Sequence, residues 1–176
     1  MALRAGLSVL PLVLVVVSSS LGGAMPAAAA PAPAAMLQSY AGTYTGSGAL
    51  SGGTTPQTVR CRLNLQSTAP AKLNYTGRCS VSGTSFSMTG IITYEGGNYT
   101  AAMSSNAGTS ATVVGKKRGG GVVFSSSQDI TIEGRPRAVT STLALSGGTI
   151  RVDYKVVDDK TGKTSAGTIP FVKSSR

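Results

Sequence analysis

The chain has 176 residues, contains no histidine and no tryptophan, and carries 16 basic against 6 acidic side chains. The lack of histidine excludes Ser-His-Asp and Cys-His nucleophilic catalysis and removes the commonest transition-metal ligand. The formal net charge of +10 fits either an anionic partner or the solubility of an exported domain.

The first thirty residues have the pattern of a secretory signal peptide. Arg4 supplies a positive start, the apolar run Val9–Val17 is interrupted only by Pro11, and three small residues end at Ala30. The alternative is a membrane anchor, but the apolar run is too short to cross a bilayer. We therefore predict that residues 1–30 are a cleaved signal peptide and that the mature protein is periplasmic or secreted.

The next segment, residues 31–39, is rich in proline and alanine, and we predict that it is a disordered tether. The first strand is then predicted from Tyr40 to Leu50, with Tyr44 and several glycines on one face. Glycine on the inner face of a strand permits the sharp coiling and close approach that barrel closure requires.

A hairpin containing both cysteines follows. Its turn is centred on Pro70, so Cys61 lies directly opposite Cys79. Directly opposed antiparallel residues lie roughly 4.5–5.5 Å apart, which suits a disulfide. Apolar residues keep to one face of both strands, in agreement with this register. They are Val59, Cys61, Leu63 and Leu65 on the first strand, and Leu73, Tyr75, Cys79 and Val81 on the second.

Later turns preserve the same inner face. Ser82-Gly83 places Phe86 opposite Cys79, Gly96-Gly97 places Tyr99 opposite Tyr94, and Gly147-Gly148 joins two further strands. The remaining strands are predicted at 110–115, 121–127, 137–146, 149–157 and 166–173.

Together these elements predict one all-β domain over residues 40–174. Successive strands pair as neighbours, so we expect an antiparallel up-and-down β-barrel of about eight to ten strands with one disulfide. The alternative is a two-sheet β-sandwich.

Three short stretches resemble a family. Gly42-Thr43-Tyr44-Thr45-Gly46-Ser47-Gly48, Val59-Arg60-Cys61-Arg62-Leu63 and Gly77-Arg78-Cys79 are similar to a group of small bacterial exported proteins with calycin-like barrels. These are lipocalin- or avidin-style folds to which no function is assigned. Many lipocalins and avidins have tryptophan where Tyr44 stands, so the resemblance does not imply avidin-like ligand stacking.

Three arginines form a candidate anion-binding patch on the outer face. In the predicted register Arg62 lies opposite Arg78, with Arg60 two positions along. Like charges directly opposed in a sheet are unfavourable unless something relieves them. In one interpretation, nearby carboxylates or water relieve the repulsion, and the aliphatic parts of the arginine side chains cover apolar surface. In the other, the guanidinium groups bind a carboxylate, phosphate or sulfate.

Inward aromatic residues are candidates for a ligand pocket. They are Tyr44, Tyr75, Phe86, Tyr94 and Tyr99. A barrel of this size is either filled by its own side chains or holds one small ligand. No pair of carboxylates is demonstrably convergent, and we predict no catalytic residue, metal site or cofactor.

The sequence therefore favours an exported, non-enzymatic binding barrel. It would hold a small apolar ligand inside or an anionic cell-envelope component outside, with no specific binding of nucleic acid. The alternative is a periplasmic protease inhibitor that inserts its N-terminal segment into an exported protease. That alternative rests on a loose resemblance to small bacterial metalloprotease inhibitors with one disulfide.

Overall fold

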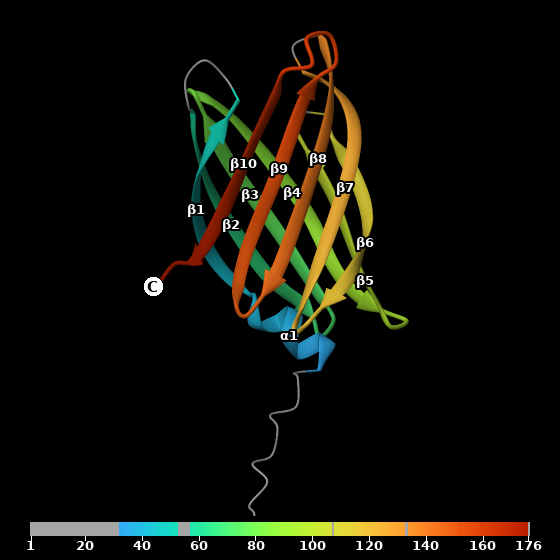
Figure 1. Ribbon diagram of the computed structural model, residues 1–176. Helices are drawn as coiled ribbons and strands as arrows, with labels where there is room; N and C mark the ends of the chain where they lie inside the picture. Colours follow the sequence, from blue (N-terminus) through green and yellow to red (C-terminus); the bar gives the residue numbers. More distant parts are fainter. Residues whose placement is uncertain (1–31, 53–56, 107, 133, 176) are drawn as a thin grey trace, which may run out of the picture.

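The computed structural model describes residues 32–52, 57–106, 108–132 and 134–175. The predicted signal peptide lies outside these residues. The described chain forms one helix and ten strands (Figure 1). They are α1 (Pro33–Ser39), β1 (Gly42–Ser51), β2 (Gln57–Ala69), β3 (Lys72–Val81), β4 (Thr84–Glu95), β5 (Asn98–Ser105), β6 (Ser110–Arg118), β7 (Gly121–Ile132), β8 (Arg135–Ser146), β9 (Thr149–Asp158) and β10 (Thr164–Lys173).

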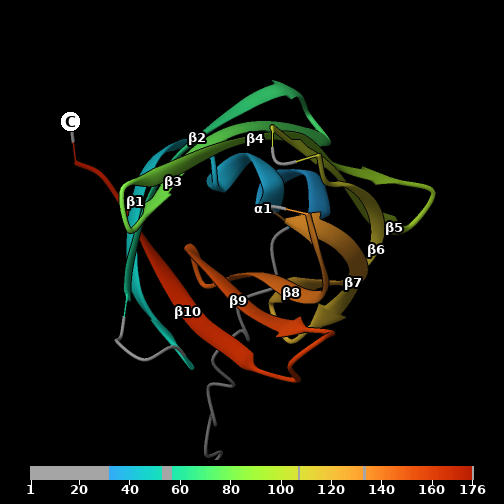
Figure 2. The same cartoon turned by 90° about the horizontal axis from the view of Figure 1, so that it is seen from above.

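The strands form a closed antiparallel barrel. Each strand pairs with its neighbours in sequence, and β1 pairs with β10 to close the ring. Figure 2 shows this ring from above, with β2 to β4 on one side and β8 to β10 on the other. The predicted up-and-down barrel is confirmed at the upper end of the expected strand number, and the two-sheet sandwich is wrong.

The predicted strand registers are also confirmed. Cys61 pairs with Cys79, their sulfur atoms form a disulfide, and their Cα atoms lie 4.1 Å apart. Phe86 pairs with Cys79, and Tyr94 pairs with Tyr99. At the Ser82-Gly83 turn φ is 48° and 81°, both positive, as a type I′ hairpin turn requires.

Large side chains cover inward-facing glycines on the neighbouring strands. Tyr75 pairs with Gly90, and a Cβ added to Gly90 would collide with the Tyr75 ring. Tyr154 pairs with Gly167, where an added Cβ would lie 2.6 Å from the tyrosine hydroxyl. The glycines let the strands coil, and the aromatic rings fill the space that the missing side chains leave.

The segment before the barrel differs from the sequence prediction. Pro33–Ser39, predicted as part of a disordered tether, is helix α1 with Met36 and Leu37 buried. The Tyr40 hydroxyl accepts a hydrogen bond of 3.3 Å from the Gly148 N–H in the β8–β9 turn. The helix therefore covers one end of the barrel, and in Figure 2 it lies within the ring of strands.

The amino-acid composition of α1 explains why this segment is helical. Proline fits the first turn of a helix, and alanine has the highest helix propensity, so a Pro/Ala composition is compatible with a helix as well as a tether. Met36, Leu37 and Tyr40 then lie on one face and bury against the barrel. Among the described residues, no helix has the length and apolarity needed to cross a membrane.

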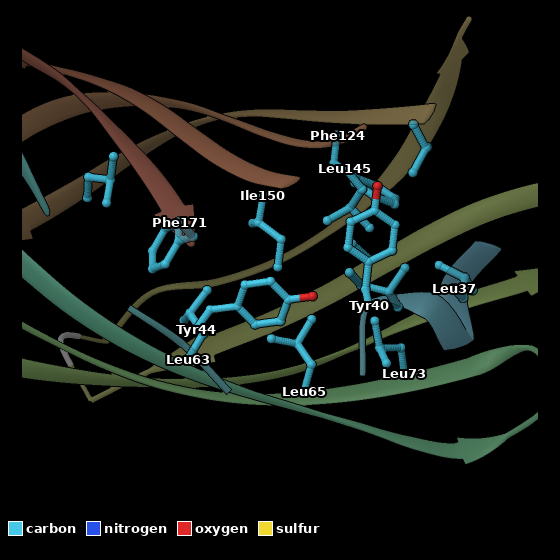
Figure 3. Packing of buried hydrophobic residues seen from close by; sticks show 14 of the residues in the cluster. Leu37, Tyr40, Tyr44, Leu63, Leu65, Leu73, Phe124, Leu145, Ile150 and Phe171 are labelled. Carbon is cyan, nitrogen blue, oxygen red and sulfur yellow. The ribbon is translucent and has the colours of Figure 1, made fainter. Parts of the chain in front are cut away.

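The core fills the end of the barrel next to α1. Figure 3 shows Tyr40 and Tyr44 between leucine side chains from α1, β2 and β3 on one side and Phe124, Leu145 and Ile150 on the other. The largest fully buried side chains are Tyr40, Tyr44, Leu37, Leu73, Ile92, Leu145, Ile150 and Val122. This end is thus closed by packed apolar side chains.

One seam of the barrel is only partly paired. In the described part of the chain, β6 and β7 pair at three positions, all next to the turn that joins them, from Lys116↔Val123 to Arg118↔Gly121. Farther along, the Gln128 side chain bridges the two strands by donating a hydrogen bond of 2.9 Å from Nε2 to the Ser110 carbonyl oxygen. The seam therefore opens toward the end of the barrel opposite α1.

We expect fast amide hydrogen exchange along this seam. About every second backbone N–H group of residues 110–115 and 124–130 points into the seam, where no strand pairs with it. These N–H groups should therefore become accessible to exchange at an opening free energy close to zero. Exchange measured by NMR should show these alternate amides exchanging much faster than those of the fully paired β8 and β9. Uniform protection along β6 and β7 would contradict an open seam.

Candidate functional site

The interior of the barrel changes from packed to accessible along its axis. Next to α1 most inward side chains are buried, whereas many inward positions farther along are partly exposed; Val59, Cys61, Cys79 and Ile169 are buried there too. These partly exposed positions include Phe86, Met88, Val113, Leu143, Val152 and Tyr154. An inward side chain in a closed barrel is reached by solvent only through an open end or an open seam. The inner surface away from α1 is therefore accessible.

The five predicted interior residues divide between these two regions. Tyr44 and Tyr99 are buried, with 0% and 3% of their surfaces exposed. The rings of Tyr94 and Tyr99 contact each other with centroids 4.7 Å apart and planes tilted by 49°, and the Lys117 ammonium lies 5.7 Å from the Tyr94 centroid. These three tyrosines belong to the closed end.

Tyr75 and Phe86 are the predicted candidates that face the accessible region. Both are partly buried and pack against the core. Burial raises the pKa of the Tyr75 hydroxyl to about 12, so this group is a neutral hydrogen-bonding phenol at physiological pH. Phe86 pairs with Cys79 and so lies beside the disulfide.

Three buried polar atoms have no hydrogen-bond partner in the described structure. They are the hydroxyl oxygens of Tyr44 and Tyr154 and Nε of Arg137. A buried polar group without a partner costs about 1–3 kcal/mol, so each of these atoms is a candidate for contact with a ligand or water. Sequence reasoning missed Tyr154 and Arg137, although alternation places them on the inner face with Val152 and Val139.

Arg137 lies at the open end of the barrel. It pairs with Asp158 across β8 and β9, with 3.5 Å between Nη2 and Oδ2. Asp158 Oδ1 accepts hydrogen bonds of 3.0 Å from both the Thr161 N–H and the Thr161 hydroxyl. These hydrogen bonds hold the pKa of the Asp158 carboxyl below its usual range, and the Arg137 guanidinium acts in the same direction. The Asp158 carboxylate is therefore ionised and already has hydrogen-bond and ion-pair partners. Arg137, in contrast, keeps one N–H donor without a partner, at Nε.

A pair of serine hydroxyls lies on the same wall. Ser126 of β7 and Ser141 of β8 are paired in register, and their hydroxyl oxygens lie 2.7 Å apart. Ser141 also pairs with Tyr154 on β9, so these side chains form one row across three strands. The row lies two inward positions beyond the buried residues Leu145 and Ile150.

The three predicted anion-binding arginines lie together on the outer surface. Arg62 pairs with Arg78, as predicted, and all three side chains are exposed. With Arg60 they line a hollow of about 770 Å³ together with Thr45, Ser47, Ser80, Pro170 and Val172. Arg78 donates a hydrogen bond of 3.0 Å to the Ser85 hydroxyl. We call this surface the arginine hollow.

No carboxylate neutralises the arginine hollow among the described residues. The ion pairs of the described residues join Arg137 to Asp158 and Arg151 to Asp153, and none of them includes Arg60, Arg62 or Arg78. Of the two sequence-based interpretations, relief by neighbouring carboxylates is therefore not supported. The described part of the chain also contains no cluster of three or more acidic or cysteine side chains that could hold a metal ion.

Comparison with known proteins supports the fold. No protein-family model and no curated protein sequence matches the chain. Among solved structures, Rv2717c from M. tuberculosis is similar with a TM-score of 0.61 and 16% identity, over 82% of this chain and 99% of that one. The phycobiliprotein lyase CPES from Guillardia theta matches with a TM-score of 0.50 and 9% identity, over 81% and 92%. At these identities the likeness shows a shared calycin-like barrel fold.

Proposed function

We propose that the protein is an exported, non-enzymatic barrel that binds a small, largely apolar ligand in its interior. The observation that supports this most directly is the accessible inner surface beyond the closed end, lined by Phe86, Met88, Val113 and Val152. Small-ligand sites are typically concave and apolar, with a few polar groups that fix orientation. Export is proposed from the predicted signal peptide, and the disulfide is compatible with an oxidising compartment.

The geometry gives less support to the inhibitor alternative. That mechanism needs an N-terminal segment free to enter a protease cleft. Met36 and Leu37, in the middle of that segment, are 7% and 0% exposed and pack into the barrel end. Withdrawing them would expose both apolar side chains to water.

Native mass spectrometry of the protein purified from its own host tests the binding function. We expect a noncovalent adduct of a few hundred daltons that disappears after mild denaturation and refolding. The refolded protein should then regain the adduct when it is mixed with an organic extract of the same host. Protein that carries no adduct and acquires none from the extract would contradict interior ligand binding.

A second candidate function is binding of an anionic cell-envelope polymer at the arginine hollow. Three exposed guanidinium groups, with no carboxylate partner among the described residues, surround serine and threonine hydroxyls there. Guanidinium groups form paired hydrogen bonds with carboxylate, phosphate and sulfate, and hydroxyls supply further donors.

Changing Arg60, Arg62 and Arg78 together to serine should weaken binding to heparin, which serves as a model polyanion. At about 0.5–1 kcal/mol per exposed charge contact, we expect a loss of roughly ten- to a hundredfold at low salt. The salt dependence of binding should also become shallower. Changing Lys116, Lys117 and Arg118 to serine removes the same charge elsewhere and should have a much smaller effect. Equal losses in the two triple variants would show that only net charge matters.

A further inference from the structure

The strands that carry the arginine hollow form a sector of the barrel without acidic residues. In the ring, β10, β1, β2 and β3 are consecutive neighbours (Figure 2). None of these four strands contains an aspartate or a glutamate. Their basic residues are Arg60, Arg62, Lys72, Arg78 and Lys173. The sector is therefore positively charged, with no negative charge of its own.

The two flanking strands supply no free carboxylate to the hollow. On β9, Asp153 pairs with Arg151 and Asp158 pairs with Arg137. On β4, Glu95 is the last residue and lies next to the turn at the α1 end. The part of β4 that faces the hollow presents serine, because Ser80 pairs with Ser85 and Arg78 pairs with Ser87.

The arginines of the hollow have unused hydrogen-bond donors. Arg62 lies directly opposite Arg78, where like charges repel each other. Arg78 donates one hydrogen bond, to Ser85. Within the described ranges, the guanidinium groups of Arg60 and Arg62 have no hydrogen-bond or ion-pair partner. A bound group with two negative charges and several acceptor oxygens would relieve the repulsion and accept from these donors.

Charge distinguishes among the oxyanions that such a site could bind. Near pH 7, carboxylates, sulfate esters and phosphate diesters each carry one negative charge. A phosphate monoester carries nearly two, because its second pKa is about 6, and it presents three strong acceptor oxygens. One phosphate monoester can therefore neutralise both members of the opposed pair Arg62 and Arg78.

An apolar surface adjoins the hollow on β10. Val172 pairs with Thr45, which pairs with Arg62, so these outward side chains lie in one row across three strands. At the usual spacing of neighbouring strands, the backbones of Val172 and Arg62 are about 10 Å apart. Val172 is 70% exposed, and Pro170 lines the hollow beside it. A ligand held at the arginine pair therefore meets apolar side chains where it extends toward β10.

We propose that the arginine hollow binds a phosphate monoester whose organic substituent is apolar next to the phosphate. This assignment of ligand class rests on the second candidate function, binding of an anionic molecule at the hollow. The phosphate lies between Arg62 and Arg78, with Arg60 beside it. The substituent lies over Thr45 and extends toward Val172.

Three small probes test the ligand class. Phenyl phosphate carries the proposed group, phenyl sulfate has the same ring with one negative charge, and methyl phosphate has the same phosphate without the ring. Each is titrated into protein expressed from its whole sequence, in phosphate-free buffer, and the backbone amide NMR signals of β1 and β2 report binding. At pH 7, phenyl phosphate should bind about three- to tenfold more tightly than either of the other probes.

The pH dependence identifies the charge state of the ligand. Lowering the pH from 7 to 5 converts phenyl phosphate to its monoanion, so its advantage over phenyl sulfate should disappear. The chain contains no histidine, and arginine stays protonated throughout, so no side chain of the hollow titrates in this range. Binding of phenyl sulfate should therefore be the same at both pH values.

Matched variants locate the site. Changing Arg60, Arg62 and Arg78 together to serine should abolish binding of all three probes. Changing Lys116, Lys117 and Arg118 to serine removes the same charge elsewhere and should leave the three affinities nearly unchanged. Val172→Ser should weaken phenyl phosphate to the level of methyl phosphate. Val114→Ser is its control, because this valine of β6 is similarly exposed, at 63%, and lies outside the hollow.

Vesicles distinguish a lipid from a soluble source of the phosphate. Phosphatidic acid carries a phosphate monoester, so the protein is sedimented with phosphatidylcholine vesicles that contain or lack it. Cosedimentation that requires phosphatidic acid and the three arginines assigns a lipid. No cosedimentation, together with binding of phenyl phosphate, assigns a soluble molecule. Both results support the phosphate monoester class.

The outcomes separate the ligand class from binding at the hollow. Equal affinity for phenyl phosphate and phenyl sulfate at pH 7, or a preference that persists at pH 5, would overturn the phosphate monoester class. Unchanged phenyl phosphate binding in Val172→Ser would overturn the apolar substituent. If no probe shifts the signals at millimolar concentration, the class is also overturned. The hollow still binds polyanions if heparin binding requires the three arginines, and that function is overturned as well if it does not.

Discussion

Replacing Cys61 and Cys79 together by alanine should lower the free energy of unfolding by about 3 kcal/mol. The bond closes a loop of sequence separation 18, and the chain-entropy model assigns about this value to a loop of that length. Both cysteines are also buried, at 6% and 3% exposure, so the smaller alanine side chains add a modest loss of packing. Urea unfolding at pH 7, followed by circular dichroism, measures the change.

Reduction provides the control for this prediction. Wild-type protein unfolded in the presence of a phosphine reductant should lose a similar amount of stability, whereas the double alanine variant should be insensitive to the reductant. The denaturant slope should also rise in the variant, because its unfolded chain is no longer held compact by the loop. Matching unfolding midpoints for wild type and variant without reductant would show that β2 and β3 need no covalent link.

The strand registers were predictable because independent local signals agreed. In the hairpin of β2 and β3, the apolar alternation, the turn position and the two cysteines all fixed Cys61 opposite Cys79, and a shift by one residue would have turned every side chain to the wrong face. The turns at Ser82-Gly83, Gly96-Gly97 and Gly147-Gly148 carried the same register forward. Up-and-down topology needs little beyond such local pairing.

The features that sequence reasoning missed depend on contacts between distant segments. The open seam between β6 and β7 is one of them. Local patterns predicted both strands. The length over which they pair, however, depends on the closure of ten strands into a ring, and no local sequence pattern indicates the hydrogen bond from Gln128 to Ser110. The candidate site is similar. Alternation placed inward tyrosines but could not show that the Tyr94 and Tyr99 rings pack together near one end, or that the Tyr154 hydroxyl is buried over Gly167.

Helix α1 provides the second large effect. Changing Leu37 to alanine should lower the free energy of unfolding by about 3 kcal/mol, within the range of about 2–5 kcal/mol typical of a fully buried leucine. The Leu37 side chain is 0% exposed, and Figure 3 shows it beside Tyr40 and Leu73 at the closed end of the barrel. No compensating movement is expected, because the strands around it are held by closure of the ring.

Gln38 is the matched control, since it lies next to Leu37 on the exposed face of the same helix. Gln38→Ala should change stability by less than about 0.5 kcal/mol, as is usual for a surface substitution. A large loss for Leu37→Ala with almost none for Gln38→Ala means that the barrel fold includes its N-terminal helix as the closed end. If both variants are as stable as wild type, the segment behaves as a tether, and the interior would then be accessible from both ends.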